Sequence, residues 1–280
     1  MIPAAFDYIK ADSVDAAVSA LNDDAKVLAG GQSLIPLLRL RLAVPELLVD
    51  VGGIAEMRGV REDGDRLVIG AATTHDEVIR DGLVQQHCPV LATVTQTVAD
   101  PAVRHRGTFG GSVAHADPAG DLPATVLALD ATMTVAGPGG RREVPASEFF
   151  VDYLETAVGA DEVLVSVSVP KLGSGWGHAY EKFNRTAQAW ALVGAVALVR
   201  SNGSISEVRV GLVNMGATPV RASAAEQALA GASSANDVRA AAQAAGEGTS
   251  PASDMHASAD YRSHLARVLT GRAVTTAAGM

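Results

Sequence analysis

Two glycine-rich segments constrain the fold of this chain more than any other feature of its sequence. The first, AGGQSL, spans residues 29–34 and follows a short apolar run, and the second, RGTFGGSVAHADPAGD, spans residues 106–121. Glycine allows the backbone to approach a ligand closely, and free N–H groups at the start of a helix attract anions. The residues alone leave an alternative open for each segment: an ordinary strand-to-helix turn for the first, and a structured glycine loop with Asx turns for the second.

Hydrophobic periodicity predicts helices and strands around these segments. Residues 13–23 carry apolar side chains on one helical face, and Ser13 is a suitable N-cap. The other elements that the pattern predicts are strands at 25–30, 46–51 and 66–74, helices at 34–42, 75–84 and 90–99, a helix and then a strand over 125–137, and a loop from about Val103 to Pro123.

The pattern changes near residue 170 and predicts two domains. A strand-like run ends at Pro170, and the glycine-rich stretch 171–177 is typical of a linker. Beyond it we expect three strands, at 178–184, 189–200 and 205–216, followed by helices up to the C-terminus. The chain is therefore predicted to have an α+β fold with domains at 1–172 and 173–280.

Composition and missing signatures exclude several functions. A net charge of −9 without a basic run makes nucleic acid an unexpected partner. We expect no membrane span and no signal peptide, and hence a cytoplasmic protein. The single cysteine, Cys88, cannot form an internal disulfide, a structural zinc site or an iron–sulfur cluster. His75, His105 and His115 lack metal-ligand spacing, so no metal site is predicted. Redox chemistry would have to come from an organic cofactor or a partner chain.

The polar residues of the second segment suit binding better than catalysis. Asp117 and Asp121 could accept hydrogen bonds from ribose or ribityl hydroxyl groups, whereas a glycine loop is a poor place for an acid–base pair. Ser33 and Ser112 lack the GxSxG pattern of a hydrolase, and neither GxGxxG nor GxxxxGK[ST] occurs. These patterns therefore offer no candidate for a catalytic residue.

Four motifs together resemble one known family. They are AGGQSLIPLLRLRLAVPELLVDVGGI (29–54), IGAATTH (69–75), VADPAVRHRGTFGGSVAHADPAGDLPA (98–124) and YEKFNR (180–185). Over nearly its whole length the chain resembles the FAD-binding medium subunit of molybdenum hydroxylases, a family that includes carbon monoxide dehydrogenase medium chains and the flavin domain of xanthine dehydrogenase. The resemblance implies a two-lobed FAD-binding domain of the vanillyl-alcohol-oxidase (PCMH) type, with the lobes dividing near 55–60. A smaller α+β domain with a three-stranded sheet and helices would follow.

The same resemblance implies which residues hold FAD, without a covalent bond, between the two lobes. These cofactor-binding candidates are Ala29, Gly30, Gly31, Gln32, Ser33, Leu34, Thr74, His75, Thr108, Phe109, Gly110, Gly111, Ser112, Asp117, Asp121, Leu164 and Lys182. Two departures from the family stand out. Gln32 replaces the histidine usual in carbon monoxide dehydrogenase medium chains, and Thr186 and Ala189 replace an arginine and an aspartate after Lys182.

By resemblance, the chain is an electron-transfer subunit of a three-subunit enzyme. A large molybdopterin subunit would oxidise carbon monoxide, an aldehyde, a purine or another N-heterocycle. A small iron–sulfur subunit would pass electrons to FAD on this chain, which would deliver them to a quinone, NAD or oxygen. A dimer of heterotrimers, with peripheral membrane contact through a partner, is the implied assembly. Two alternatives remain: a free-standing FAD-dependent oxidase or reductase, and a flavin-free assembly subunit.

Overall fold

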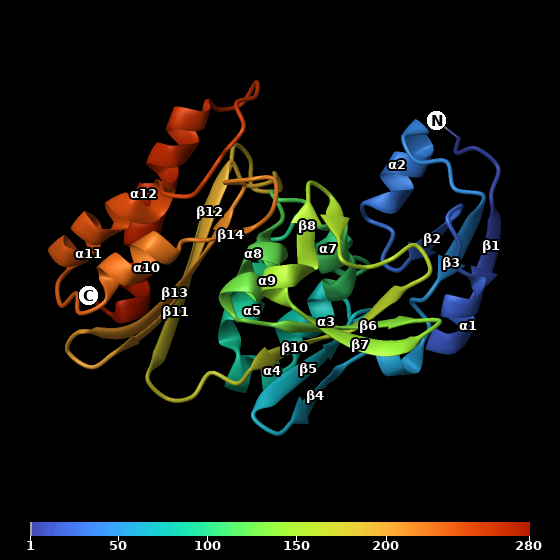
Figure 1. Cartoon of the computed structure of the whole chain (residues 1–280), viewed down its shortest axis with the longest axis horizontal. Helices are drawn as coiled ribbons and strands as arrows, with labels where there is room; N and C mark the ends of the chain where they lie inside the picture. The colour runs from blue at the N-terminus through green and yellow to red at the C-terminus, as the bar shows by residue number, and fades with distance from the viewer. Residues whose placement is uncertain (1) are drawn as a thin grey trace.

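The computed structural model describes residues 2–280 and shows three α+β units arranged in a row (Figure 1). The N-terminal lobe, the central unit and the C-terminal unit each contain a sheet with helices packed on it. The predicted α+β class is therefore confirmed. No helix among the described residues is long and apolar enough to cross a membrane.

The N-terminal lobe contains a parallel three-stranded sheet in the order β1-β3-β2. Its elements are β1 (Asp7–Lys10), α1 (Val14–Ala20), β2 (Ala25–Leu28), α2 (Leu34–Leu40) and β3 (Leu47–Asp50). The predicted cap of α1 is confirmed, because the Ser13 hydroxyl accepts a hydrogen bond from the Ala16 N–H at 3.2 Å. The first glycine-rich segment lies between β2 and α2, where a parallel strand gives way to a helix.

The central unit contains an antiparallel sheet in the order β4-β5-β10-β6-β7, with helices over one face (Figure 1). Its strands are β4 (Val60–Asp63), β5 (Arg66–Gly70), β6 (Thr132–Gly137), β7 (Gly140–Pro145) and β10 (Val163–Pro170), with a small pair β8 (Phe150–Asp152) and β9 (Glu155–Thr156). Its helices are η1 (Ala55–Met57), α3 (His75–Arg80), α4 (Gly82–His87), α5 (Pro89–Thr95), α6 (Pro101–Arg104), α7 (Phe109–His115), α8 (Asp121–Ala128) and α9 (Ala146–Phe149). Leu67, Met133 and Val167 are fully buried in the core of this unit.

Two expectations for this unit were wrong. The predicted loop from about Val103 to Pro123 contains all of α7 and the start of α8, because the Thr108 hydroxyl caps α7 and Phe109 and Val113 are buried in the core. The single helix predicted over 75–84 is two helices, α3 and α4. The Asp81 carboxylate separates them by accepting hydrogen bonds from the first N–H groups of α4.

The C-terminal unit packs helices on one face of an antiparallel sheet. The strands β11 (Trp176–Phe183), β12 (Val193–Ser201), β13 (Ile205–Val213) and β14 (Val220–Arg221) lie in sequence order, so the sheet has a short fourth strand beyond the three predicted. The helices are α10 (Ser223–Leu229), α11 (Ala235–Ala241), η2 (Ala242–Gly246) and α12 (Ala259–Ala278). Helix α12 covers β11 and β12, while α5 and α8 of the central unit contact the same sheet.

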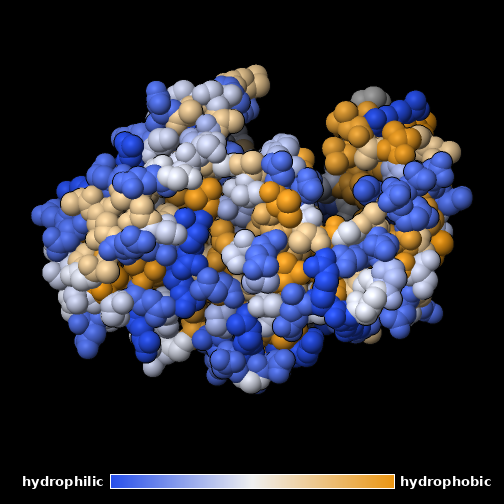
Figure 2. Space-filling model, viewed as in Figure 1, coloured by the Kyte–Doolittle hydropathy of each residue, from blue (hydrophilic) through white to orange (hydrophobic). Residues whose placement is uncertain are grey.

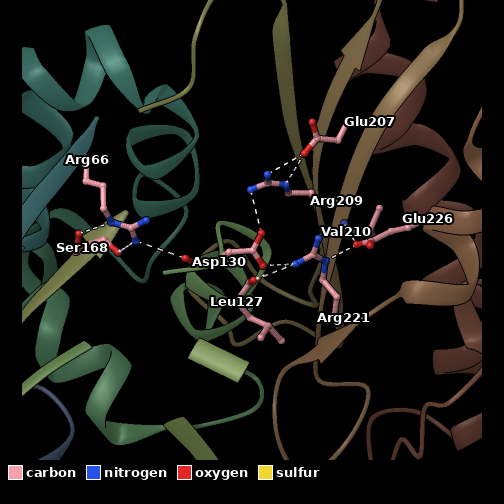
Figure 3. A network of polar contacts seen from close by, with 9 residues as sticks. All are labelled: Arg66, Leu127, Asp130, Ser168, Glu207, Arg209, Val210, Arg221 and Glu226. Atoms are coloured by element: carbon pink, nitrogen blue, oxygen red, sulfur yellow. Dashed lines mark hydrogen bonds and ion pairs between the residues drawn. The ribbon is translucent and has the colours of Figure 1, made fainter. Parts of the chain in front are cut away.

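A polar network joins the C-terminal unit to the end of α8 (Figure 3). The Asp130 carboxylate forms ion pairs with Arg209 at 3.0 Å and Arg221 at 2.8 Å, both from the C-terminal sheet. Arg209 also lies over the Trp176 ring, 5.1 Å from its centroid. Arg66 extends the network on the central side, because its guanidinium donates to the Asp130 carbonyl at 3.5 Å and to the Ser168 carbonyl at 2.9 Å. The network therefore fixes the position of β13 and β14 against the central unit.

Candidate functional site

The first glycine-rich segment is a turn with a run of free backbone donors. Gly31 has a φ of +72°, a conformation that favours glycine. Within residues 2–280, the N–H groups of Gly30, Gly31, Gln32 and Ser33 donate to no backbone or side-chain acceptor. The Ser33 hydroxyl does not cap α2. Adjacent free N–H groups at a turn can bind an anion such as a diphosphate.

The second glycine-rich segment uses its N–H groups inside the protein. The Phe109 N–H donates to the Thr73 carbonyl at 2.8 Å, the Gly110 N–H to the Ala71 carbonyl at 2.9 Å, and the Gly111 N–H to the Thr108 hydroxyl at 3.2 Å. Gly110 is needed for close packing, since a Cβ there would lie 2.3 Å from the Ala71 Cβ.

Exposure differs along the second segment. Thr108, Phe109 and Gly110 are buried, whereas Gly111 is exposed and Ser112 is partly exposed. Only the last two residues of this predicted group are therefore accessible to a ligand without a rearrangement of the chain.

The structure brings the two glycine-rich segments into direct contact. A Cβ on Gly30 would lie 2.2 Å from the Arg106 carbonyl oxygen and 2.6 Å from the Gly107 Cα. This contact links the N-terminal lobe to the central unit, although the segments lie far apart in the sequence. Figure 2 shows a hollow between the N-terminal lobe and the rest of the molecule, on the side of the molecule where α2 lies in Figure 1.

His75 lies beside this contact and has an unpartnered polar atom. A Cβ on Gly107 would meet its ring at 3.0 Å, and its side chain is almost fully buried. The Nδ1 atom has no hydrogen-bond partner in the described part of the chain. Burial and the nearby Arg104 guanidinium lower the pKa of His75 to about 4. A neutral imidazole with a free nitrogen is compatible with a hydrogen bond to a bound polar group.

The side chains of Thr74 and Asp117 form hydrogen bonds that stabilise local structure. Thr74 caps α3 in a reciprocal capping box with Glu77. One oxygen of Asp117 accepts a hydrogen bond from the Ala119 N–H at 2.9 Å, so this residue forms the Asx turn that the sequence left open. Leu164 is buried next to a bulge in β10, where the carbonyl of Val165 accepts from the N–H of Ala71. Thr74 also forms an isolated β-bridge with Thr108 of the second glycine-rich segment.

Asp121 and Lys182 form a buried ion pair between the central and C-terminal units. The Lys182 ammonium lies 2.9 Å from one Asp121 oxygen and also donates to the Thr97 carbonyl at 3.2 Å. Asp121 is 5% exposed and the Lys182 side chain 9%. The Tyr180 hydroxyl donates to the other Asp121 oxygen at 2.5 Å. Burial raises the pKa of the Asp121 carboxyl, against the opposing effects of Lys182 and Tyr180.

Tyr180 was absent from the residues chosen by sequence. Tyr180 lies two residues before Lys182 in a predicted strand, and residues two apart in a strand share a face. The sequence could therefore have indicated that the two side chains lie side by side. The pair with Asp121 could not be foreseen, since α8 and β11 belong to different units.

No other feature of the described residues competes as a cofactor site. Among residues 2–280, no three His, Cys, Asp or Glu side chains lie close enough to hold a metal ion. Two surface cavities of about 500 and 410 Å³ lie away from the glycine-rich segments, one along β1 and β3 and one over β10 between η1 and β7. Free N–H groups, an unpartnered imidazole nitrogen and close backbone contacts together fit a large polar cofactor with an anionic part.

Comparison with known proteins defines the class. Residues 4–172 match the family described as the FAD binding domain in molybdopterin dehydrogenase, and residues 178–277 match the CO dehydrogenase flavoprotein C-terminal domain. The chain belongs to this family of FAD-binding medium subunits of molybdenum hydroxylases, and it is therefore a component of an oxidoreductase.

Individual relatives match along their whole length. The carbon monoxide dehydrogenase medium chain of Hydrogenophaga pseudoflava is 41% identical over 99% of this chain and 98% of its own. The 6-hydroxypseudooxynicotine dehydrogenase complex subunit alpha of Paenarthrobacter nicotinovorans is 38% identical over 99% of this chain and 96% of its own. A solved structure of the Hydrogenophaga pseudoflava carbon monoxide dehydrogenase, lacking the Mo-pyranopterin moiety, superposes with a TM-score of 0.96 at 43% identity over 99% of this chain and 98% of that one. The resemblance, the fold class and FAD as the cofactor are thereby confirmed.

Proposed function

We propose that this chain holds FAD where the two glycine-rich segments meet and transfers electrons through it. Electrons would arrive from an iron–sulfur small subunit and leave to a quinone, NAD or oxygen. The primary substrate would be oxidised in a large molybdopterin subunit. The contact of Gly30 with Arg106 and Gly107, beside a run of free N–H groups, is the observation that carries this proposal.

Different residues of the chain would bind different parts of FAD. The N–H groups of residues 30–33 would bind the diphosphate, with the accessible Gly111 and Ser112 beside them. The Lys182 ammonium would lie towards the flavin ring and favour negative charge there. The bound flavin supplies the redox chemistry, while the protein binds and orients it and sets its potential. Residues of this chain need not act on the primary substrate.

An apolar surface on the N-terminal lobe supports assembly with other chains. Side chains in and after α2 are well exposed: Ile35 at 43%, Leu40 at 50%, Leu42 at 72% and Val44 at 61%. Figure 2 shows a hydrophobic region on this lobe, beside the hollow. Contiguous apolar surface commonly marks a protein–protein interface.

We propose large and small partner subunits in a dimer of heterotrimers, located in the cytoplasm, with peripheral membrane contact through a partner. A division of this chain at about residue 172 is part of the same proposal.

Co-expression with candidate partner genes tests the function. We expect a purified complex that contains FAD, and we expect its visible flavin absorbance to bleach when substrate is added anaerobically. Omission of the iron–sulfur subunit should abolish the bleaching. Bleaching of the isolated chain by substrate would instead establish a free-standing oxidase or reductase. A complex that assembles without flavin would establish an assembly subunit.

A further inference from the structure

The Tyr180 hydroxyl is part of the buried contact that holds Lys182. A carboxylate has two oxygens, and in Asp121 one oxygen pairs with Lys182 while the other accepts from Tyr180. Tyr180 and Lys182 therefore bind Asp121 from the same face of β11. Through this shared partner, the tyrosine fixes the rotation of the carboxylate and so the position of the ammonium group.

One N–H group of the Lys182 ammonium has no acceptor in the described part of the chain. An ammonium group has three donors. Asp121 and the Thr97 carbonyl accept two of them, at 2.9 and 3.2 Å. The third has no acceptor among residues 2–280. A buried ammonium group that is held in place by two hydrogen bonds, and that has a third N–H group free, is well placed to bind a ligand.

The strand opposite is shaped around the hydroxyl. Gly194 of β12 pairs with Lys182 in the sheet, and a Cβ on Gly194 would lie 2.6 Å from the Tyr180 hydroxyl oxygen. Any larger residue at 194 would push the hydroxyl away from Asp121. The absence of a side chain at this position is thus a second, independent feature that preserves the contact between Tyr180 and Asp121.

We propose that Tyr180 is a positioning residue for the cofactor site, acting through Asp121 to hold the Lys182 ammonium with one N–H free for the flavin. The inference rests on the proposed placement of FAD beside Lys182. Tyr180 itself need not touch the cofactor. Its hydroxyl donates a hydrogen bond to the buried Asp121 carboxylate. Without this bond, the carboxylate would have an unsatisfied oxygen and would turn away from the lysine.

A double-mutant cycle in the assembled complex tests this. Tyr180→Phe should raise the FAD dissociation constant about tenfold and shift the flavin midpoint potential, because one hydrogen bond to a charged group is lost. In a Lys182→Met background the same change should alter neither quantity. Tyr261→Phe is the matched control, since the Tyr261 hydroxyl makes no hydrogen bond within residues 2–280 and lies in the same unit.

Gly194→Ala provides a second variant. It should reproduce the effects of Tyr180→Phe. Adding it to Tyr180→Phe should cause a smaller change than it causes in the wild type, because the 2.6 Å contact with the hydroxyl is then gone and only the ring carbons at 3.2 Å remain close. Equal effects of Tyr180→Phe in both backgrounds would show a general structural role and overturn the inference, while the proposed function would stand. If Lys182→Met alone left the FAD dissociation constant and the potential unchanged, the placement of FAD beside Lys182 and the inference would both fail.

Discussion

One added methyl group at residue 30 should push the two glycine-rich segments apart. Gly30 does not have a positive φ, so alanine brings no backbone strain there. Its Cβ would, however, lie 2.2 Å from the Arg106 carbonyl oxygen, and Cβ contacts below 3.0 Å are essentially never found. The segments must therefore separate by about 0.8 Å or more at this point. Because both neighbours are backbone atoms, a change of side-chain rotamer cannot relieve the contact.

The displacement should be felt in cofactor binding and in stability. Overpacking of this kind costs about 1–3 kcal/mol of the free energy of unfolding. In catalysis, a misplacement of about 1 Å can cost about 100-fold in rate, and we take this as the upper bound for the displaced binding groups. We therefore expect Gly30→Ala to raise the FAD dissociation constant about 10- to 100-fold, which corresponds to roughly 1.4–2.7 kcal/mol.

The assay needs a glycine control. Gly139→Ala, in the turn between β6 and β7, places its Cβ where no atom lies within 4 Å, and Gly139 has no positive φ. The FAD dissociation constant can be measured by the fluorescence of released FAD, and stability by thermal melting of the same complexes. The Gly139 variant should match the wild type in both. A Gly30→Ala complex with wild-type affinity and melting temperature would refute the idea that this contact builds the site.

Three further predictions follow from single contacts. Burial holds the pKa of His75 near 4, below its ordinary 6.5, so the folded state binds fewer protons and the free energy of unfolding should fall by about 2 kcal/mol from pH 7 to pH 5. Urea unfolding should show this loss reduced in His75→Leu, and an equal loss in the variant would contradict the assignment. Gly111→Val should lower flavin content and remove about 1 kcal/mol of stability, since its Cβ would lie 2.6 Å from the capping Thr108 hydroxyl; normal flavin content would count against the site. Asp130→Asn should lower the free energy of unfolding by less than about 1 kcal/mol at low salt, because its carboxylate is 59% exposed, and melting in high salt should abolish the difference.

The strands that the sequence did not reveal are all edge strands. β1, β4 and β7 lie at the edges of their sheets, and most of their side chains are exposed. Interior strands such as β10 and β12 are apolar because both of their faces are covered, so a run of valine and alanine identifies them. An edge strand carries charged and polar residues that prevent association with other chains, and these residues remove the hydrophobic alternation.

The parts of the candidate site could be predicted from the sequence, but the way in which they come together could not. Glycine clusters and the family resemblance identified both segments. The different duties of Gly30, Gly110 and Gly111 depend on contacts with distant residues, and these contacts exist only after folding. The glycines of the second segment were expected to let a ligand lie against the main chain, yet the N–H groups of Phe109, Gly110 and Gly111 bind other groups of the chain. A glycine in the sequence indicates that the backbone at that position is closely approached, but it does not identify the ligand or protein group that approaches it.

Two of the polar contacts between the central and C-terminal units differ in kind: the Asp130 network and the pair of Asp121 with Lys182. The half-exposed Asp130 network is of a type that adds modest stability and orients neighbouring surfaces. The buried pair of Asp121 and Lys182 is different, because removing two charges from water costs about as much as their attraction returns. Two apolar side chains of similar volume would serve the packing at least as well. A charged lysine at this position, with a tyrosine bonded to its partner, therefore agrees with the proposed contact between the free ammonium donor and FAD.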